Sequence, residues 1–212
     1  MKRRIIIFGN GQLSAVFLRE IKTKDLVIGV DGAAYWLLTH GVKPQTAVGD
    51  FDSVTRSELS VIRRKIKEVM IYPREKAATD MELALNWALK QKPGEIIIMG
   101  GVGSRFDHTA ATVQLLEKAL KHNIETKLRD QHNEIFLAKG ERAINKSKQY
   151  KYVSLLPVTS HIKLSLTGFR YNLERKIISR GQTLGVSNEV AARVAKISIH
   201  AGLALVIRSR DH

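Results

Sequence analysis

Residues 95–105 read Glu95-Ile96-Ile97-Ile98-Met99-Gly100-Gly101-Val102-Gly103-Ser104-Arg105, a short apolar run that leads into a glycine-rich loop. Unbroken apolar runs of this length are typical of strands covered on both faces, as in a parallel sheet. A helical pattern follows over residues 109–121, with one apolar face formed by Val113, Leu116 and Leu120. The stretch therefore predicts a strand, a loop and a helix in succession, which is the repeating unit of a parallel α/β sheet.

The same alternation extends over the first 130 residues. Five more strands are expected there, at Arg4–Phe8, Leu26–Val30, Thr46–Val48, Val69–Tyr72 and Glu125–Leu128. Helices fill the intervals: one over Asp31–His40, and two that open at Thr55 and Thr79, where a Thr-x-x-Glu spacing is typical of a capping box. We expect a doubly wound, mainly parallel α/β domain, which binds its ligands at the carboxyl ends of the strands.

After about residue 131 helical periodicity fades and short β-rich runs follow one another. The expected strands are Glu134–Leu137, Tyr152–Leu156, Ile162–Leu166, Lys176–Ile178, Ala195–His200 and Leu203–Ile207. Turn signals such as Ala201-Gly202 separate them, as in an antiparallel β-sandwich or barrel. We expect a domain boundary within residues 130–148, around the polar stretch Lys139–Lys148, and assign residues 1–132 to the α/β domain and 133–212 to a C-terminal antiparallel β-sandwich.

Composition excludes several classes of protein. The 212 residues include no cysteine, so disulfides, cysteine-ligated metals and a cysteine nucleophile are ruled out. The first apolar run is too short for a signal peptide, and no run approaches the length that spans a bilayer. A soluble, cytoplasmic protein with no membrane partner is therefore expected.

Acidic residues follow the expected strands or open the helices of the first domain. They are Asp31, the pair Asp50 and Asp52, Asp80, and Asp107. Residues two apart in an extended segment face the same way, so Asp50 and Asp52 can share one ion. A single aspartate is more often an N-cap or turn residue, but a set of them at one sheet edge would repel without a cation. Carboxylate oxygens suit Mg²⁺, which also binds substrate phosphates.

Groups that bind phosphate lie in the same loops. Glycines let backbone N–H groups approach a phosphate closely, and they occur both around Asn10 and in residues 100–103. Neither loop has the P-loop pattern, and Ser14 stands where the dinucleotide fingerprint needs a third glycine or alanine. Arg105 and Lys76 add positive charge that can contact phosphate oxygens.

Two alternatives remain open on these residues. Asp50-Phe51-Asp52 is a D-x-D pattern, which also holds metal and nucleotide in many sugar transferases. The formal net charge of +15 and the basic run Arg63-Arg64-Lys65 also fit a nucleic-acid-binding protein. No recognised nucleic-acid motif accompanies the charge, so we expect no nucleic-acid partner.

Seven segments resemble, in order and spacing, the motifs of thiamine pyrophosphokinases. They are Asp31-Gly32-Ala33-Ala34-Tyr35-Trp36-Leu37-Leu38, Gly49-Asp50-Phe51-Asp52-Ser53, Lys76-Ala77-Ala78-Thr79-Asp80, Gly103-Ser104-Arg105-Phe106-Asp107-His108, Ser154-Leu155-Leu156-Pro157, Thr167-Gly168-Phe169-Arg170-Tyr171-Asn172-Leu173 and Gly185-Val186-Ser187-Asn188-Glu189. The resemblance implies an α/β domain followed by a β-sandwich, in a homodimer whose active sites lie between one chain's α/β domain and the other's sandwich. It also implies transfer of the diphosphate of ATP to the hydroxyl of thiamine, giving thiamine diphosphate and AMP, with Mg²⁺ as cofactor.

The resemblance assigns roles to single residues. Asp50, Asp52 and Asp80 would hold magnesium and the ATP phosphates, and Asp31 and Asp107 would complete the catalytic acids. Both Asp31 and Asp107 stay open as the acceptor of the thiamine hydroxyl proton. The expected contacts to ATP or its phosphates are Asn10, Lys76, Thr79, Arg105 and His108, and the expected contacts to thiamine are Tyr171, Ser187 and Asn188.

The chain departs from the family pattern at two positions. The family often has an acid after the lysine of the third segment, where this chain has Ala77, and more often has glycine at the position of Ala33. The missing acid is expected to alter the metal environment or the affinity for nucleotide. Ala33 matters only if the backbone there needs a positive φ.

Overall fold

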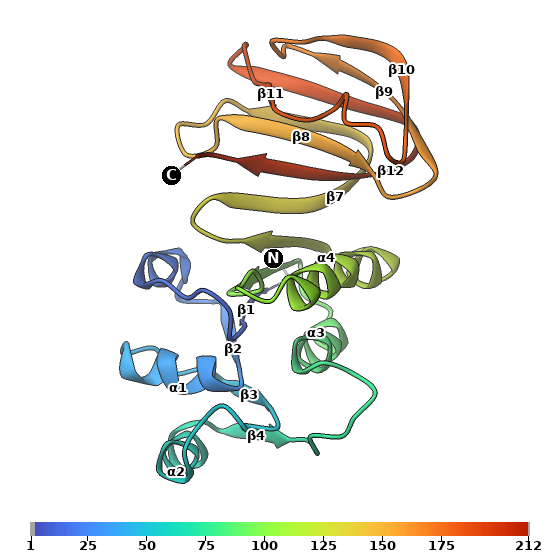
Figure 1. Ribbon diagram of the computed structural model, residues 1–212. Helices are drawn as coiled ribbons and strands as arrows, with labels where there is room; N and C mark the ends of the chain where they lie inside the picture. The colour runs from blue at the N-terminus through green and yellow to red at the C-terminus, as the bar shows by residue number, and fades with distance from the viewer. Residues whose placement is uncertain (1–2, 212) are drawn as a thin grey trace. The chain divides into compact units, whose positions relative to one another are not determined.

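The computed structural model describes residues 3–211. Its internal contacts divide the chain into two compact units, and the division falls between Asp130 and Gln131 (Figure 1). The polar stretch Lys139–Lys148, which the sequence placed at the boundary, lies within the second unit. Residues up to Asn145 of this stretch belong to a strand, because a strand with one exposed face accommodates polar side chains.

The first unit is built on six parallel strands in the order β6-β5-β1-β2-β3-β4. Their bounds are β1 (Arg4–Phe8), β2 (Leu26–Val30), β3 (Thr46–Gly49), β4 (Glu68–Ile71), β5 (Glu95–Met99) and β6 (Glu125–Arg129). All six expected strands form, with ends that shift by one residue at most. The central strands β1 and β5 are almost entirely buried, as their unbroken apolar runs predict.

Helices cover both faces of this sheet, so the doubly wound α/β prediction is confirmed (Figure 1). The helices are α1 (Gly32–Thr39), α2 (Arg56–Lys65), α3 (Asp80–Lys90) and α4 (Phe106–Lys121), with a 3₁₀ helix η1 (Ala15–Glu20) that the sequence did not predict. Figure 1 shows η1, α1 and α2 on one side of the strands and α3 and α4 on the other.

The helix starts follow the expected chemistry, with one shift. Thr55 and Glu58 form the complete capping box of α2, whereas at α3 only the Thr79 hydroxyl accepts, from the Glu82 N–H. Helix α4 begins at Phe106, three residues earlier than predicted. Asp107 therefore lies in the first turn of α4, where the helix dipole favours an acid, and not in the preceding loop.

The direction of winding reverses between β1 and β5. From β1 the chain adds β2, β3 and β4 on one side, and β5 and β6 lie on the other. The loops that follow these two strands are hydrogen-bonded together, with the Gly11 N–H 2.9 Å from the Gly100 carbonyl oxygen. A side chain on Gly11 would collide with that carbonyl and with Val102, so glycine is required for the approach. Ligands of such sheets bind beside this reversal.

The second unit is antiparallel. Its strands are β7 (Asn133–Asn145), β8 (Tyr152–Pro157), β9 (His161–Thr167), β10 (Leu173–Ser179), β11 (Asn188–Glu189) and β12 (Val194–Ser209). The first half of β12 pairs with β9 and the second half with β8, while β7 pairs along both. The strands of this unit enclose a core that includes Leu155, Leu164, Phe169, Ile197 and Val206, so the sandwich prediction is confirmed.

One prediction within this unit was wrong. Ala195–His200 and Leu203–Ile207 were expected as separate strands, but both belong to β12. A register irregularity after Ile199 absorbs the extra residues, and Gly202 adopts a φ of 82° that glycine accommodates without strain. The turn signal at Ala201-Gly202 therefore marks a bend in one long strand. Within residues 3–211, no helix is long and apolar enough to cross a membrane.

Candidate active site

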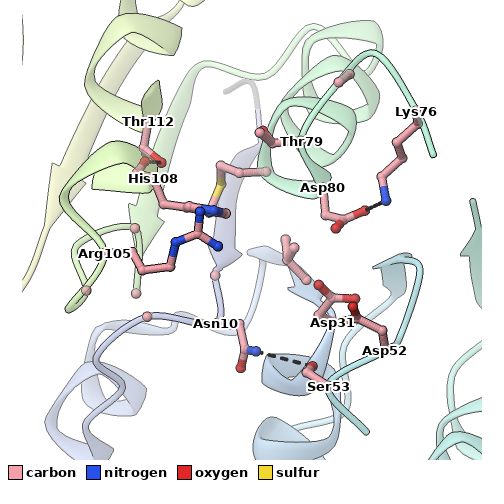
Figure 2. Close-up of a pocket in the computed structure, with 18 of the residues that line it drawn as sticks. Asn10, Asp31, Asp52, Ser53, Lys76, Thr79, Asp80, Arg105, His108 and Thr112 are labelled. Atoms are coloured by element: carbon pink, nitrogen blue, oxygen red, sulfur yellow. Dashed lines mark hydrogen bonds and ion pairs between the residues drawn. The ribbon is translucent and has the colours of Figure 1, made fainter. Parts of the chain in front are cut away.

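A cavity of about 600 Å³ opens in the first unit where the loops after β1 to β5 meet the first residues of α3 and α4 (Figure 2). It contains the hydrogen-bonded glycine loops described above. All five predicted contacts to ATP line it, together with two of the predicted catalytic acids and the predicted metal ligand Asp80: Asn10, Asp31, Asp52, Lys76, Thr79, Asp80, Arg105 and His108. Residues far apart in sequence are therefore collected at the edge of the sheet where the topology favours a ligand.

Three aspartates on neighbouring loops form an acidic cluster. Asp31, Asp50 and Asp52 each offer one carboxylate oxygen, and these oxygens lie within 4.8 Å of one another. Figure 2 shows Asp31 and Asp52 side by side on one wall of the cavity. Asp50 is not among the lining residues, so it adds charge from behind the wall.

The backbone holds Asp31 in an unusual conformation. Its φ is 49°, a region that residues other than glycine rarely adopt, and Phe51 has a φ of 58°. The Phe51 N–H donates to Asp31 Oδ1 at 2.8 Å, and Gly49 leaves room for this carboxylate because it lacks a Cβ. Strained residues of this kind concentrate at functional sites, where the surrounding structure compensates for them.

Burial raises the pKa of Asp31 to about 7, and the nearby charges of Asp80 and Asp50 act in the same direction against the opposing Phe51 N–H. A divalent cation would offset this repulsion, and hard carboxylate oxygens are the donors that Mg²⁺ prefers. The residues therefore fit a magnesium site.

Lys76 balances part of the acidic charge. Its Nζ lies 2.8 Å from Asp50 Oδ2 and 3.0 Å from Asp80 Oδ1. The hydrogen bond from Lys76 lowers the pKa of Asp50. Burial alone would lower the pKa of Lys76, but its bonds to Asp50 and Asp80 raise it instead. The structure thus places Lys76 in the cavity wall, paired with two carboxylates.

Arg105 and His108 lie on the opposite wall from Asp31 and Asp52 (Figure 2). Arg105 binds Asp107 through Nε at 3.2 Å and an Nη at 2.6 Å, and both side chains are exposed. The bond between the two side chains raises the pKa of Arg105 and lowers that of Asp107. Asp107 is not among the residues that line the cavity, so the structure does not bring it together with Asp31.

Two residues that the sequence did not single out also belong to the site. The Ser53 hydroxyl accepts from the Gly32 N–H and from Asn10 Nδ2, each at 3.2 Å, and so ties together the loops after β1, β2 and β3 (Figure 2). Arg74 lines the cavity from the loop after β4. Ser53 ends the Gly49–Ser53 segment and could have been included on that ground; Arg74 lies in no motif.

The two departures from the family pattern have different consequences. Ala33 is fully buried in helix α1 and has no positive φ, so alanine is accommodated there without strain. Ala77 is exposed and lines the cavity, so the cavity wall lacks the acid that the family pattern often has at this position.

The residues expected to bind thiamine form a second group, in the second unit. The Asn188 side chain is buried and holds Tyr171 at both backbone groups: Oδ1 accepts from the Tyr171 N–H at 3.1 Å, and Nδ2 donates to its carbonyl at 2.7 Å. Tyr171 is 61% exposed. Ser187 has a φ of 58°, and its N–H donates to the Ser154 hydroxyl at 3.0 Å. Asn188 therefore positions Tyr171, whose ring is accessible.

Comparison with known proteins gives consistent results over both units. Residues 17–128 match the thiamin pyrophosphokinase catalytic domain, and residues 141–204 match the thiamin pyrophosphokinase vitamin B1 binding domain. Thiamine pyrophosphokinase of Bacillus subtilis is 40% identical over 188 residues, which cover 88% of each chain.

Solved structures show the same likeness in three dimensions. The thiamine pyrophosphokinase structure from Bacillus subtilis superposes with a TM-score of 0.92 at 35% identity, covering 99% of this chain and 100% of the other. The thiamin pyrophosphokinase structure from Geobacillus thermodenitrificans gives a TM-score of 0.89 at 32% identity, covering 98% of each chain. On the strength of both domain matches and of these relatives, the chain belongs to the thiamin pyrophosphokinase family.

Proposed function

We propose that this chain transfers the diphosphate of ATP to the hydroxyl of thiamine, forming thiamine diphosphate and AMP. The observation that carries the proposal is the cavity of the first unit, where an acidic cluster and glycine loops meet in a domain that matches the family's catalytic domain. Neither alternative is favoured: a D-x-D sugar transferase or a nucleic-acid-binding protein would not account for a match that includes both units.

Magnesium is the proposed cofactor. Asp31 and Asp52 line the cavity within reach of one ion, Asp50 contributes charge from behind them, and Asp80 lies on the adjoining helix start. A bound Mg²⁺ would polarise and neutralise the phosphate oxygens of ATP. Transfer of this kind needs positioning and charge neutralisation more than covalent participation of the protein.

The chain's own groups would orient the two reactants. Helix α4 begins beside the cavity, and its N-cap residue Arg105, which lines the cavity, makes no side-chain capping bond. Such a helix start favours an anion. Asp31 is the preferred acceptor for the thiamine hydroxyl proton because it lines the cavity, whereas Asp107 does not.

The second unit is proposed to bind thiamine through the accessible ring of Tyr171, since an aromatic face attracts a cationic ligand. We also propose a homodimer that works in the cytoplasm. Four exposed apolar side chains of this unit are the candidates for its interface, since a contiguous exposed apolar patch marks a contact surface; they are Ile177, Leu184, Val186 and Val194.

Product analysis tests the proposal directly. The chain is incubated with ATP, Mg²⁺ and thiamine, and the products are separated by chromatography. Equal amounts of AMP and thiamine diphosphate are expected, with no AMP when thiamine is left out. Formation of ADP and thiamine monophosphate would contradict the proposal, because it would mean transfer of a single phosphoryl group.

A further inference from the structure

The positive charges of the cavity differ in how firmly they are held. Among the described residues that line it, three carry a permanent positive charge: Arg74, Lys76 and Arg105. A cation that is already bound to buried acids cannot turn to a ligand without leaving those acids unpaired, which is costly. The partners of each cation therefore indicate which of them can bind a phosphate.

Lys76 is held most firmly. Its side chain is 12% exposed and lies between Asp50 and Asp80, whose side chains are 12% and 17% exposed. Any movement of the ammonium toward a ligand would lengthen both bonds and leave two largely buried carboxylates unneutralised. Lys76 is therefore a positioning residue, which fixes Asp50 and Asp80.

Arg105 is held less firmly than Lys76 but more firmly than Arg74. Its two contacts with Asp107 have good geometry, but both side chains are largely exposed, and exposed ion pairs contribute little. Arg105 can therefore turn toward a ligand, although Asp107 competes for it.

Arg74 is the least constrained. Its side chain is 82% exposed, and its ion pair is a long contact of 3.5 Å between Nε and Asp52 Oδ2. The guanidinium keeps further N–H donors for a ligand, and its planar fork matches the oxygens of a phosphate.

We infer that Arg74 binds the phosphate chain of the nucleotide from the loop after β4, and that Lys76 acts from within the wall without touching the ligand. The inference rests on the proposed function in that it assigns the bound polyphosphate to ATP. Arg74 lies two residues before the segment Lys76–Asp80 and in none of the motifs shared with the family.

Two measurements on the full chain test the inference. The first is calorimetric binding of inorganic tripolyphosphate in the presence of EDTA, which requires neither magnesium nor turnover. The second is the KM for ATP in the AMP-forming reaction. The variants are Arg74→Ala, Arg74→Lys and, as a matched control, Arg64→Ala, which removes an exposed charge from helix α2 outside the cavity.

Arg74→Ala is expected to weaken tripolyphosphate binding and to raise the KM for ATP by about tenfold each, which corresponds to ~1.4 kcal/mol. The KM for thiamine and the Tm should not change, Arg74→Lys should restore part of the affinity, and Arg64→Ala should behave as the unaltered chain. Unchanged tripolyphosphate affinity in Arg74→Ala would overturn the inference. Failure of the unaltered chain to form AMP would instead overturn the proposed function, and the calorimetry would still decide the role of Arg74.

Discussion

Lys76 Nζ lies 2.8 Å from Asp50 Oδ2, and both side chains are only 12% exposed. The cavity therefore contains a largely buried ion pair behind its acidic wall. Removing Lys76 leaves both Asp50 and Asp80 uncompensated, whereas removing Lys76 and Asp50 together leaves only Asp80, so the two single changes should not be additive. This non-additivity would measure how far Lys76 and Asp50 depend on each other.

We predict that Lys76→Met lowers the free energy of unfolding by about 1–3 kcal/mol, the cost of leaving a buried polar group unpaired. Asp50→Asn should also destabilise, and the double variant should lose less than the sum of the two. Urea denaturation of all four proteins gives the coupling energy. Strictly additive losses would show that Lys76 and Asp50 do not depend on each other.

Asp52→Asn should abolish AMP formation while the chain stays folded. Asp52 is exposed and lines the cavity, so its carboxylate serves the ligand more than the fold. AMP release is measured with ATP, Mg²⁺ and thiamine, and folding by circular dichroism. Asp107→Asn is the matched control, because Asp107 does not line the cavity and should retain most of the activity. Normal turnover by Asp52→Asn would remove Asp52 from the metal site.

Much of this fold could be predicted from the sequence because buried parallel strands have an unmistakable pattern. Ile5–Phe8 and Ile96–Met99 are unbroken runs of apolar residues, and each is followed by glycines. The long strand β12 could not be predicted in the same way. Its bend contains Gly202, and a glycine between two apolar runs fits a turn as well as it fits a bulge. Pairing with three other strands decides between them, and such pairing is not visible in local sequence.

The site was predictable to a similar degree. Aspartates after strands were expected at one sheet edge, and Asp31, Asp50 and Asp52 do lie together. The partners of the cations were not predictable: the phosphate contacts expected of Lys76 and Arg105 stay predictions, but the sequence did not indicate that Asp50 and Asp80 bind Lys76. Whether a cation is free depends on burial and on side chains from other loops, and sequence spacing reports neither.

The pair Arg4 and Asp25 should make stability depend on pH. Burial alone would raise the pKa of Asp25, but the Arg4 and Lys22 hydrogen bonds and the Arg4 charge outweigh it and lower the pKa. A carboxyl with a depressed pKa adds stability that is complete above its unfolded pKa and is lost as pH falls through the folded one. The loss should therefore begin below about pH 4.

Asp25→Asn should consequently reduce the free energy of unfolding at pH 7 and much less so near pH 3. Urea denaturation at the two pH values measures the difference. Glu75→Gln, which changes an exposed carboxylate in the same unit, should leave both values unaltered. An equal effect of Asp25→Asn at both pH values would mean that the ion pair does not contribute.

Tyr171 and Asn188 are expected to respond differently to substitution although they are joined by two hydrogen bonds. Tyr171→Ala removes an exposed ring and should raise the KM for thiamine about three- to fivefold, the range of a cation–π contact at an accessible site, while the Tm stays constant. Tyr171→Phe should keep the KM because it keeps the ring.

Asn188→Ala should instead lower the Tm, because Asn188 is 6% exposed and its loss leaves the Tyr171 backbone groups without their partner. It should also raise the KM for thiamine, since Tyr171 is then no longer held in place. Thermal unfolding and steady-state kinetics on the three variants separate the two roles. A lower Tm in Tyr171→Ala, or an unchanged Tm in Asn188→Ala, would reverse the assignment: the tyrosine would support the fold, and the asparagine would be free to contact the substrate.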